Sequence, residues 1–226
     1  MTNKTSLGDL IIESKEKTKK LIVLFHGYGD NAENFSSLVG EINSGLKNFS
    51  FFIPNAPSSL PNYPTGRQWF DLYPNGINFN QAGPKEKEIM KKDIVRSMNL
   101  IEEYINKICL KFNLSKKDCL LIGFSQGAMI AYEYGKYIDQ IFGGCILLSG
   151  RILPSKSHIT KNFIKTPLMV VHGDQDNILE PKYFFETCEI LDNYGYQYEK
   201  YLNQDETHTI SLKTINLIKK FIKKKL

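Results

Sequence analysis

A serine stands at the centre of a short interruption between two apolar runs, in the sequence G-F-S-Q-G of residues 123–127. The residues before it, C-L-L-I, are typical of a buried strand, and those after it, A-M-I-A-Y-E-Y, are typical of a helix. In such a strand-to-helix turn a serine is either a tight-turn residue or a nucleophile, and a nucleophile needs glycines such as those at 123 and 127, which let neighbouring backbone approach it closely. The three fixed residues of this G-x-S-x-G pattern occur by chance in roughly one chain of this size in fifteen. The pattern alone is therefore weak evidence, and a catalytic Ser125 needs partners elsewhere in the sequence.

A serine hydroxyl is a poor nucleophile unless a base takes its proton and an acid orients that base. His208 follows the last predicted strand and precedes the final helix, which is where such a base belongs. Asp174 and Asp176 both follow an apolar strand, and spacing alone does not separate them; the alternative for Asp176 is a loop or helix-capping carboxylate. The order Ser125, Asp176, His208 is that of α/β-hydrolases. Of the other histidines, His26 and His172 are expected to brace loops. His158 is expected to lie on an exposed, lysine-rich stretch.

An acyl-transfer site also needs donors for the developing oxyanion. One donor is the backbone N–H of the residue after the nucleophile, Gln126, whose side chain we therefore expect to vary with modest loss. The second is expected in H-G-Y-G-D, residues 26–30, where the two glycines let the loop point the Tyr28 N–H inward. Alternatively, Asp30 simply caps a helix that begins near Asn31, with Glu33 three residues further on.

Short apolar runs alternate with helical patterns along the whole chain, which predicts one α/β domain over residues 1–226 with a mostly parallel central sheet and helices on both faces. Open sheets of this kind bind ligands at the carboxyl ends of their strands, where the polar motifs lie. The segment 54–81 reads as a long loop rich in Pro, Asn, Gly and Tyr. The predicted strands are 21–25, 51–53, 119–122, 145–148 and 168–171, with edge strands at 10–14 and 196–202, and the predicted helices are 32–46, 84–112, 127–137, 181–193 and 210–226.

The chain of 226 residues carries a net charge of +5, and 42% of its residues are hydrophobic, which suits a globular domain. Its lysine runs are typical of solvated faces, and without interleaved aromatic residues they argue against a nucleic-acid partner. No apolar run approaches the roughly 20 residues of a membrane span, and no secretory signal is visible at the N-terminus. Four cysteines without a C-x-x-C pair favour free thiols in a reducing compartment, and hence a cytoplasmic location.

Four motifs in this order resemble the phospholipase/carboxylesterase family of α/β-hydrolases: L-F-H-G-Y-G-D-N, G-F-S-Q-G, H-G-D-Q-D-N-I-L-E-P and T-H-T-I-S. The resemblance implies the Ser125, Asp176 and His208 triad and prefers Asp176 to Asp174, because the family's acid ends its H-G-x-x-D motif. It also implies an oxyanion hole from the Tyr28 and Gln126 backbone, no metal, no organic cofactor, and an acyl cleft lined by Trp69 and the Leu153 region.

Two residues depart from the family pattern. Ala128 stands where a second glycine usually follows the serine turn, and we expect little effect because alanine is the better helix former. Thr207 stands where glycine often precedes the histidine, and a β-branched residue resists a positive φ. The loop that carries His208 is therefore expected to follow a different path.

The sequence thus predicts a serine carboxylesterase that cleaves carboxylic or thio esters of acyl chains through a Ser125 acyl-enzyme. Its substrate would be a small-molecule or lipid ester, or an acylated protein, and the alternative is a lysophospholipase or acyl-protein thioesterase acting on long chains. A catalytically idle binding protein on the same scaffold usually lacks a triad member, whereas all three are present here. No separate cap domain is visible that would favour a peptidase.

Overall fold

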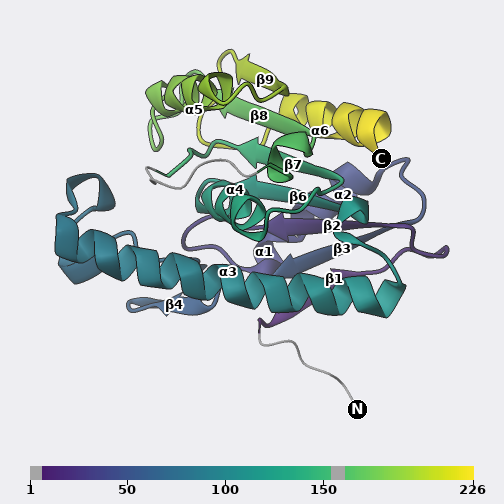
Figure 1. Cartoon of the computed structure of the whole chain (residues 1–226), viewed down its shortest axis with the longest axis horizontal. Coiled ribbons are helices and arrows are strands. Elements are labelled where there is room, and N and C mark those ends of the chain that lie inside the picture. Colours follow the sequence, from purple (N-terminus) through teal and green to yellow (C-terminus); the bar gives the residue numbers. More distant parts are fainter. Residues whose placement is uncertain (1–6, 154–160) are drawn as a thin grey trace.

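A twisted seven-stranded sheet forms the centre of the molecule (Figure 1). The computed structural model describes residues 7–153 and 161–226, so His158 lies outside the described residues. The strand order is β1-β3-β2-β6-β7-β8-β9, and every neighbouring pair is parallel except β1 with β3, which confirms the predicted mostly parallel sheet. The strands are β1 Asp9–Ile12, β2 Lys20–Phe25, β3 Phe49–Pro54, β6 Cys119–Phe124, β7 Gly144–Leu148, β8 Leu168–Gly173 and β9 Tyr198–Asn203.

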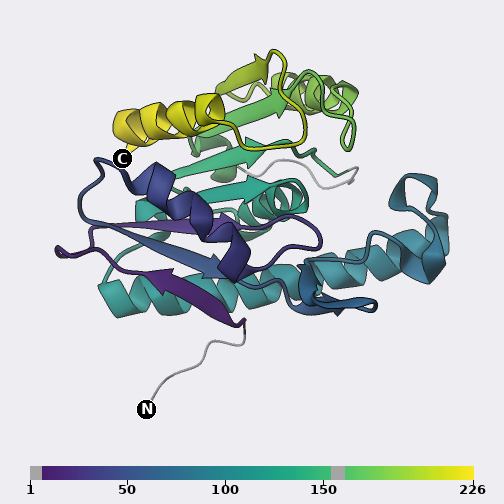
Figure 2. The same cartoon turned by 180° about the vertical axis from the view of Figure 1, so that it is seen from behind.

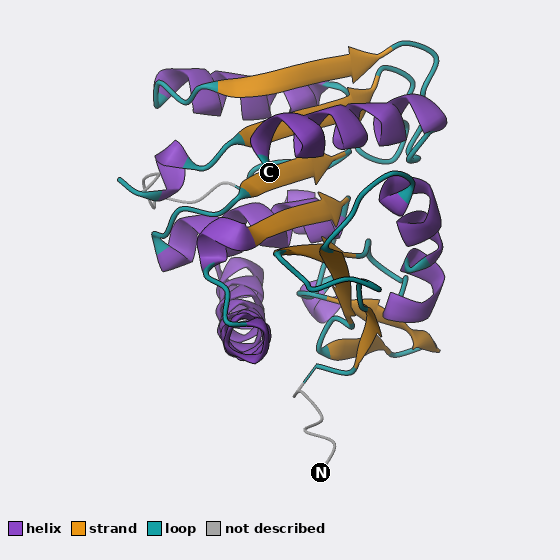
Figure 3. Cartoon of the chain, turned by 90° about the vertical axis from the view of Figure 1, so that its right-hand side faces the viewer, coloured by secondary structure: helices purple, strands orange, loops and turns teal. Residues whose placement is uncertain are grey.

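Both faces of the central strands are buried, which is why their sequences are continuous apolar runs. Alternate residues point to opposite faces: Val23 packs in one apolar cluster and Leu24 in the other. The first cluster is covered by α3 Pro84–Phe112, α4 Gln126–Ile138 and α5 Lys182–Asn193, and the second by α1 Ala32–Phe35, α2 Ser37–Asn43 and α6 Leu212–Lys225. Figure 2 shows α2 in blue and α6 in yellow in front of the sheet, and Figure 3 shows the strands in orange with helices in purple on both faces.

The helices begin and end close to the predicted residues, with one exception. Helix α3 has Pro84 in its first turn and is capped after Phe112 by Asn113, which adopts the left-handed conformation. The helix predicted over 32–46 was wrong in extent, because the chain forms the two short helices α1 and α2. The hydroxyls of Ser36 and Ser37 donate to the carbonyls of Glu33 and Asn34, and such bonds compete with a continuous helix. None of the described helices is both long and apolar enough to span a bilayer.

The segment predicted as a long loop contains regular structure. Strands β4 Ser58–Leu60 and β5 Tyr63–Gln68 form an antiparallel hairpin, and two short 3₁₀ turns follow at Pro74–Gly76 and Phe79–Gln81. The Gly29 N–H donates to the Arg67 carbonyl (2.8 Å), and the Arg67 N–H donates to the Asp30 carbonyl (2.9 Å). The hairpin therefore supports the loop that follows β2.

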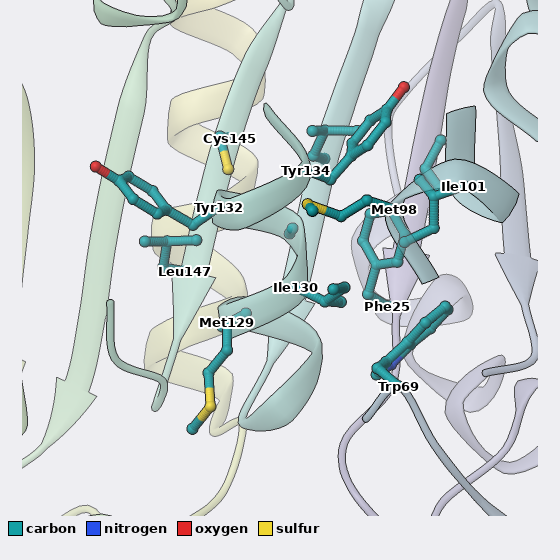
Figure 4. Close-up of a cluster of buried hydrophobic side chains, with 14 of the residues drawn as sticks. Phe25, Trp69, Met98, Ile101, Met129, Ile130, Tyr132, Tyr134, Cys145 and Leu147 are labelled. Carbon is teal, nitrogen blue, oxygen red and sulfur yellow. The ribbon is translucent and has the colours of Figure 1, made fainter. Parts of the chain in front are cut away.

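Side chains from α3, α4 and β2 meet in the core shown in Figure 4. The Trp69 ring lies edge-on to Phe25, with centroids 5.4 Å apart, and its Nε1–H donates to the His26 carbonyl (2.9 Å). Trp69 is only 1% exposed. The core thus fixes the segment after β5 directly against the loop after β2.

Candidate active site

Ser125 lies in a strained turn between β6 and α4. Its backbone has φ 54° and ψ −119°, a conformation that few non-glycine residues adopt. The Ser125 N–H donates to the Leu148 carbonyl (2.9 Å), so the turn is anchored to the end of β7. Such strain holds a serine side chain at the carboxyl edge of the sheet.

The two glycines around Ser125 are required by close backbone contacts. A Cβ at Gly127 would lie 2.0 Å from the Phe25 carbonyl oxygen, and a Cβ at Gly123 would lie 2.2 Å from the Gly127 carbonyl oxygen. Helix α4 therefore starts directly against the end of β2, as the sequence motif predicts. Ala128 fits inside the helix, where its methyl group faces Gly150.

Asp176 and His208 form a hydrogen-bonded pair, with His208 Nδ1 2.7 Å from Asp176 Oδ2. Asp176 is 2% exposed, and its other oxygen accepts the N–H groups of Ile178 (3.0 Å) and Leu179 (2.8 Å). If Nδ1 donates to the carboxylate, the Nε2 of His208 is left as a proton acceptor. The structure thus pairs His208 with Asp176, whereas Asp174 lies nearby with its N–H bonded to the Asn203 carbonyl (2.9 Å).

In the loop that carries His208, the residue with a strained backbone is not Thr207, the position that the sequence raised. The residue with a positive φ is Asp205 (57°), and Thr207 is not among the described residues with positive φ. The Thr209 N–H donates to the Thr207 carbonyl (2.8 Å), which forms a tight turn around His208. The imidazole lies against the ring of Phe124, the residue before Ser125, with centroids 4.8 Å apart. A threonine at 207 is therefore compatible with a histidine beside the serine turn.

The loop after β2 approaches Ser125 and is braced by a buried histidine. A Cβ at Gly27 would lie 3.5 Å from the Ser125 Cβ. His26 Nδ1 is 2.7 Å from the Gly27 carbonyl, and its Nε2 accepts the Ala56 N–H (3.0 Å), so the ring is neutral with its proton on Nδ1. Burial lowers the pKa of His26 to about 4. His26 thus braces this loop, as predicted.

Two backbone N–H groups flank the serine without an acceptor among the described residues, those of Tyr28 and Gln126. The Gln126 N–H is free because it belongs to the first turn of α4. The alternative for Asp30 was wrong: the residue that caps α1 is Asn31, whose side chain accepts the Asn34 N–H (3.0 Å). The cap and the candidate oxyanion loop therefore use different residues.

The side chain of Gln126 has a structural function that the sequence did not reveal. It is 1% exposed, its Oε1 accepts the Trp69 N–H (2.9 Å), and its Nε2–H donates to the Phe70 carbonyl (2.8 Å). These contacts argue against the expectation that this amide can vary with modest loss, since removing it would leave two buried backbone groups unpaired. Trp69 lies in the core and touches the serine turn through this amide.

A cavity of about 790 Å³ opens between α3 and the segment that follows β7. Leu153 and Arg151 belong to its wall, and both follow Gly150, where a Cβ would lie 3.1 Å from the Ser125 carbonyl oxygen. This volume lies within the range of small-molecule sites. The apolar members of the wall are Phe79, Pro84, Met90, Ile94, Val95, Met98 and Leu153.

Two further buried groups adjoin the Asp176–His208 pair. His172 is fully buried, with its Nε2 2.7 Å from the Leu179 carbonyl and 3.4 Å from Asp176 Oδ2, and burial lowers its pKa. It braces the acid loop, as the sequence predicted. The carboxylate of Glu206, two residues before His208, is also buried. Across residues 7–153 and 161–226, no group of three or more His, Cys, Asp or Glu side chains is arranged to hold a metal ion.

Comparison with known proteins decides the family. The sequence profile of the phospholipase/carboxylesterase family matches residues 8–226. The chain belongs to this family. Acyl-protein thioesterase 1 of Candida albicans is 28% identical over 219 residues, which cover 91% of each chain. The crystal structure of esterase PE8 has a TM-score of 0.84 at 22% identity, covering 97% of this chain and 99% of that one.

A second solved structure, the carboxylesterase of Bacillus cereus, has a TM-score of 0.76 at 16% identity and covers 97% of this chain and 95% of the other. At these identities the two structures establish the α/β-hydrolase fold. The family match makes this protein an enzyme that hydrolyses carboxylic esters.

Proposed function

We propose that this esterase works through Ser125 as nucleophile, His208 as general base and Asp176 as the acid that orients it. The observation that carries the proposal is the 2.7 Å contact between Asp176 and His208, whose ring lies against Phe124 next to the strained serine. The backbone N–H groups of Tyr28 and Gln126 are the proposed oxyanion hole, since neither has an acceptor in residues 7–153 and 161–226 and both belong to segments that meet at Ser125.

In the proposed reaction, Ser125 Oγ attacks the ester carbonyl while Nε2 of His208 takes its proton. The two N–H groups stabilise the tetrahedral oxyanion, and the imidazolium then protonates the departing alcohol or thiol. Water enters, gives a proton to His208 and attacks the acyl-enzyme, which releases the carboxylic acid and restores Ser125. Asp176 stays ionised throughout and fixes the tautomer of His208.

The substrate we propose is a carboxylic or thio ester with an apolar acyl chain. The apolar residues in the wall of the 790 Å³ cavity, which include Leu153, support this chemistry. Relatives named acyl-protein thioesterase 1 make a long-chain lipid ester or an acylated protein the alternative substrate. We also propose that residues 1–226 form one domain and act in the cytoplasm, where the four buried free thiols would stay reduced.

Replacing Ser125 with alanine tests the proposal. Turnover of p-nitrophenyl esters from acetyl to palmitoyl should fall by about 10⁴-fold or more, because removing the nucleophile of such a triad disables the whole unit. Ser37→Ala is a matched control, since its exposed hydroxyl donates to the Asn34 carbonyl of α1, in the short helical segment 32–43. A fluorophosphonate probe should label the wild type at Ser125, and an idle binding protein would stay unlabelled. Undiminished turnover in Ser125→Ala would disprove the assignment, and the chain-length profile separates short-chain from long-chain substrates.

A further inference from the structure

Glu206 places a buried carboxylate two residues before His208. The residue is 6% exposed, and its side chain accepts hydrogen bonds from three other side chains. Asn203 Nδ2 (2.9 Å) and Ser211 Oγ (2.6 Å) donate to its Oε2, and Thr214 Oγ1 (2.8 Å) donates to its Oε1. Within the described part of the chain no Lys, Arg or His forms an ion pair with it. A buried carboxylate without a cation is costly unless its hydrogen bonds are complete.

The three donors come from the two elements that bound the histidine loop. Asn203 ends β9, and Ser211 caps α6, where its hydroxyl also accepts the Thr214 N–H (3.2 Å). Asn203 donates in addition to Thr214 Oγ1 (2.9 Å), so the network is closed. The positive end of the 14-residue helix α6 favours a negative charge at this point. One carboxylate therefore joins both ends of the segment 204–210.

The backbone of Glu206 is held from the opposite side. Its carbonyl accepts the Gln175 N–H (3.0 Å), one residue before Asp176. A Cβ at Gly173 would lie 2.0 Å from that carbonyl oxygen, so the loop packs directly on the end of β8. The side chain thus fixes residue 206 to β9 and α6 while the carbonyl fixes it to the acid loop.

We propose that Glu206 is a positioning residue that holds His208 at its hydrogen-bonding distance from Asp176 and against Phe124. The inference rests on the proposed function. Asp205, with its positive φ, and the tight turn at 207–209 leave the imidazole on a short, strained loop. The Glu206 network supplies the constraint that keeps this loop in one conformation. A displacement of the imidazole by about 1 Å is enough to cost on the order of 100-fold in rate.

The test compares Glu206→Met with Glu206→Gln. Methionine keeps the volume but removes both acceptors, so kcat should fall about 10- to 100-fold with KM changed by less than about twofold. Glutamine should retain more activity, because its oxygen can still accept from Asn203 and Ser211 while Thr214 Oγ1 turns to accept from its amide. Phe221→Leu is the control: it weakens the packing of α6 through a residue that is 1% exposed, without touching the network.

A second measurement does not depend on turnover. The Nδ1 proton between His208 and Asp176 should give a low-field proton NMR signal, which Glu206→Met should weaken or broaden and Phe221→Leu should keep. If Glu206→Met and Phe221→Leu lose similar unfolding free energy and both keep wild-type kcat and this signal, Glu206 is merely structural and the proposal fails. If Glu206→Met does not fold, a wild-type kcat and signal in Glu206→Gln overturn it. Failure of the proposed function is separate, because it appears as full activity in Ser125→Ala.

Discussion

Gln126 combines a proposed catalytic role with a packing role. Its backbone N–H lies beside the proposed nucleophile and has no acceptor among the described residues, while its amide bonds the backbone of Trp69 and Phe70. The sequence indicated only the first property, because the position after the serine in G-x-S-x-G defines the N–H whatever the side chain. The amide's partners lie more than 50 positions away along the chain, and no local pattern marks them.

Replacing Gln126 with alanine should therefore destabilise the protein and slow it. The Trp69 N–H and the Phe70 carbonyl lose their buried partners, and each such loss costs about 1–3 kcal/mol. We expect the unfolding free energy to drop by about 2 kcal/mol or more, and ester turnover to fall with it. Urea unfolding and p-nitrophenyl ester hydrolysis measure both. Gln81→Ala, at an exposed position, is the control and should differ little from the wild type. A Gln126→Ala protein as stable as Gln81→Ala would contradict the expectation.

At the scale of elements, hydrophobic patterning predicted the buried central strands. It did not predict the exposed hairpin, which is held by backbone hydrogen bonds. Strands β2, β6, β7 and β8 are apolar runs with clear ends, so they lay within a few residues of the prediction. The hairpin of β4 and β5 is mostly exposed or half-buried and has an irregular register, so it lacks the alternation that would reveal it. Likewise, the left-handed residue of the histidine loop proved to be Asp205, since an aspartate tolerates that conformation better than a threonine.

The junction of β2 and α4 should tolerate no side chain at Gly127. Gly127→Ala would push its methyl group against the Phe25 and His26 carbonyls, which cannot give way because β2 is central in the sheet. We expect a loss of about 3 kcal/mol in unfolding free energy and little remaining esterase activity. Gly40→Ala, in α2 with open space around it, should instead stabilise the protein by about 0.5–1 kcal/mol. Thermal unfolding compares them, and similar midpoints would refute this reading of the junction.

At the scale of the whole molecule, the parallel sheet brings residues from three strand ends to the proposed site. Ser125 follows β6, Asp176 follows β8 and His208 follows β9, and the loop after β2 closes the group. Two of the loops concerned are braced by neutral, buried histidines, His26 and His172. The fold that assembles the site therefore depends on keeping these two imidazoles uncharged.

This dependence predicts acid sensitivity of the whole fold. The pKa of His26 is about 4 in the folded protein and about 6.5 in the unfolded chain, so the unfolded state binds more protons between these values. Stability is complete above pH 6.5 and is lost as the pH falls towards 4. From pH 8 to pH 5, His26 alone should remove about 2 kcal/mol of unfolding free energy. His172, whose pKa is also lowered, should add to the loss. Urea unfolding at both pH values measures it. His26→Asn should be less stable at pH 8 but should lose about 2 kcal/mol less on acidification, and an equal loss in both proteins would show that His26 is not the group responsible.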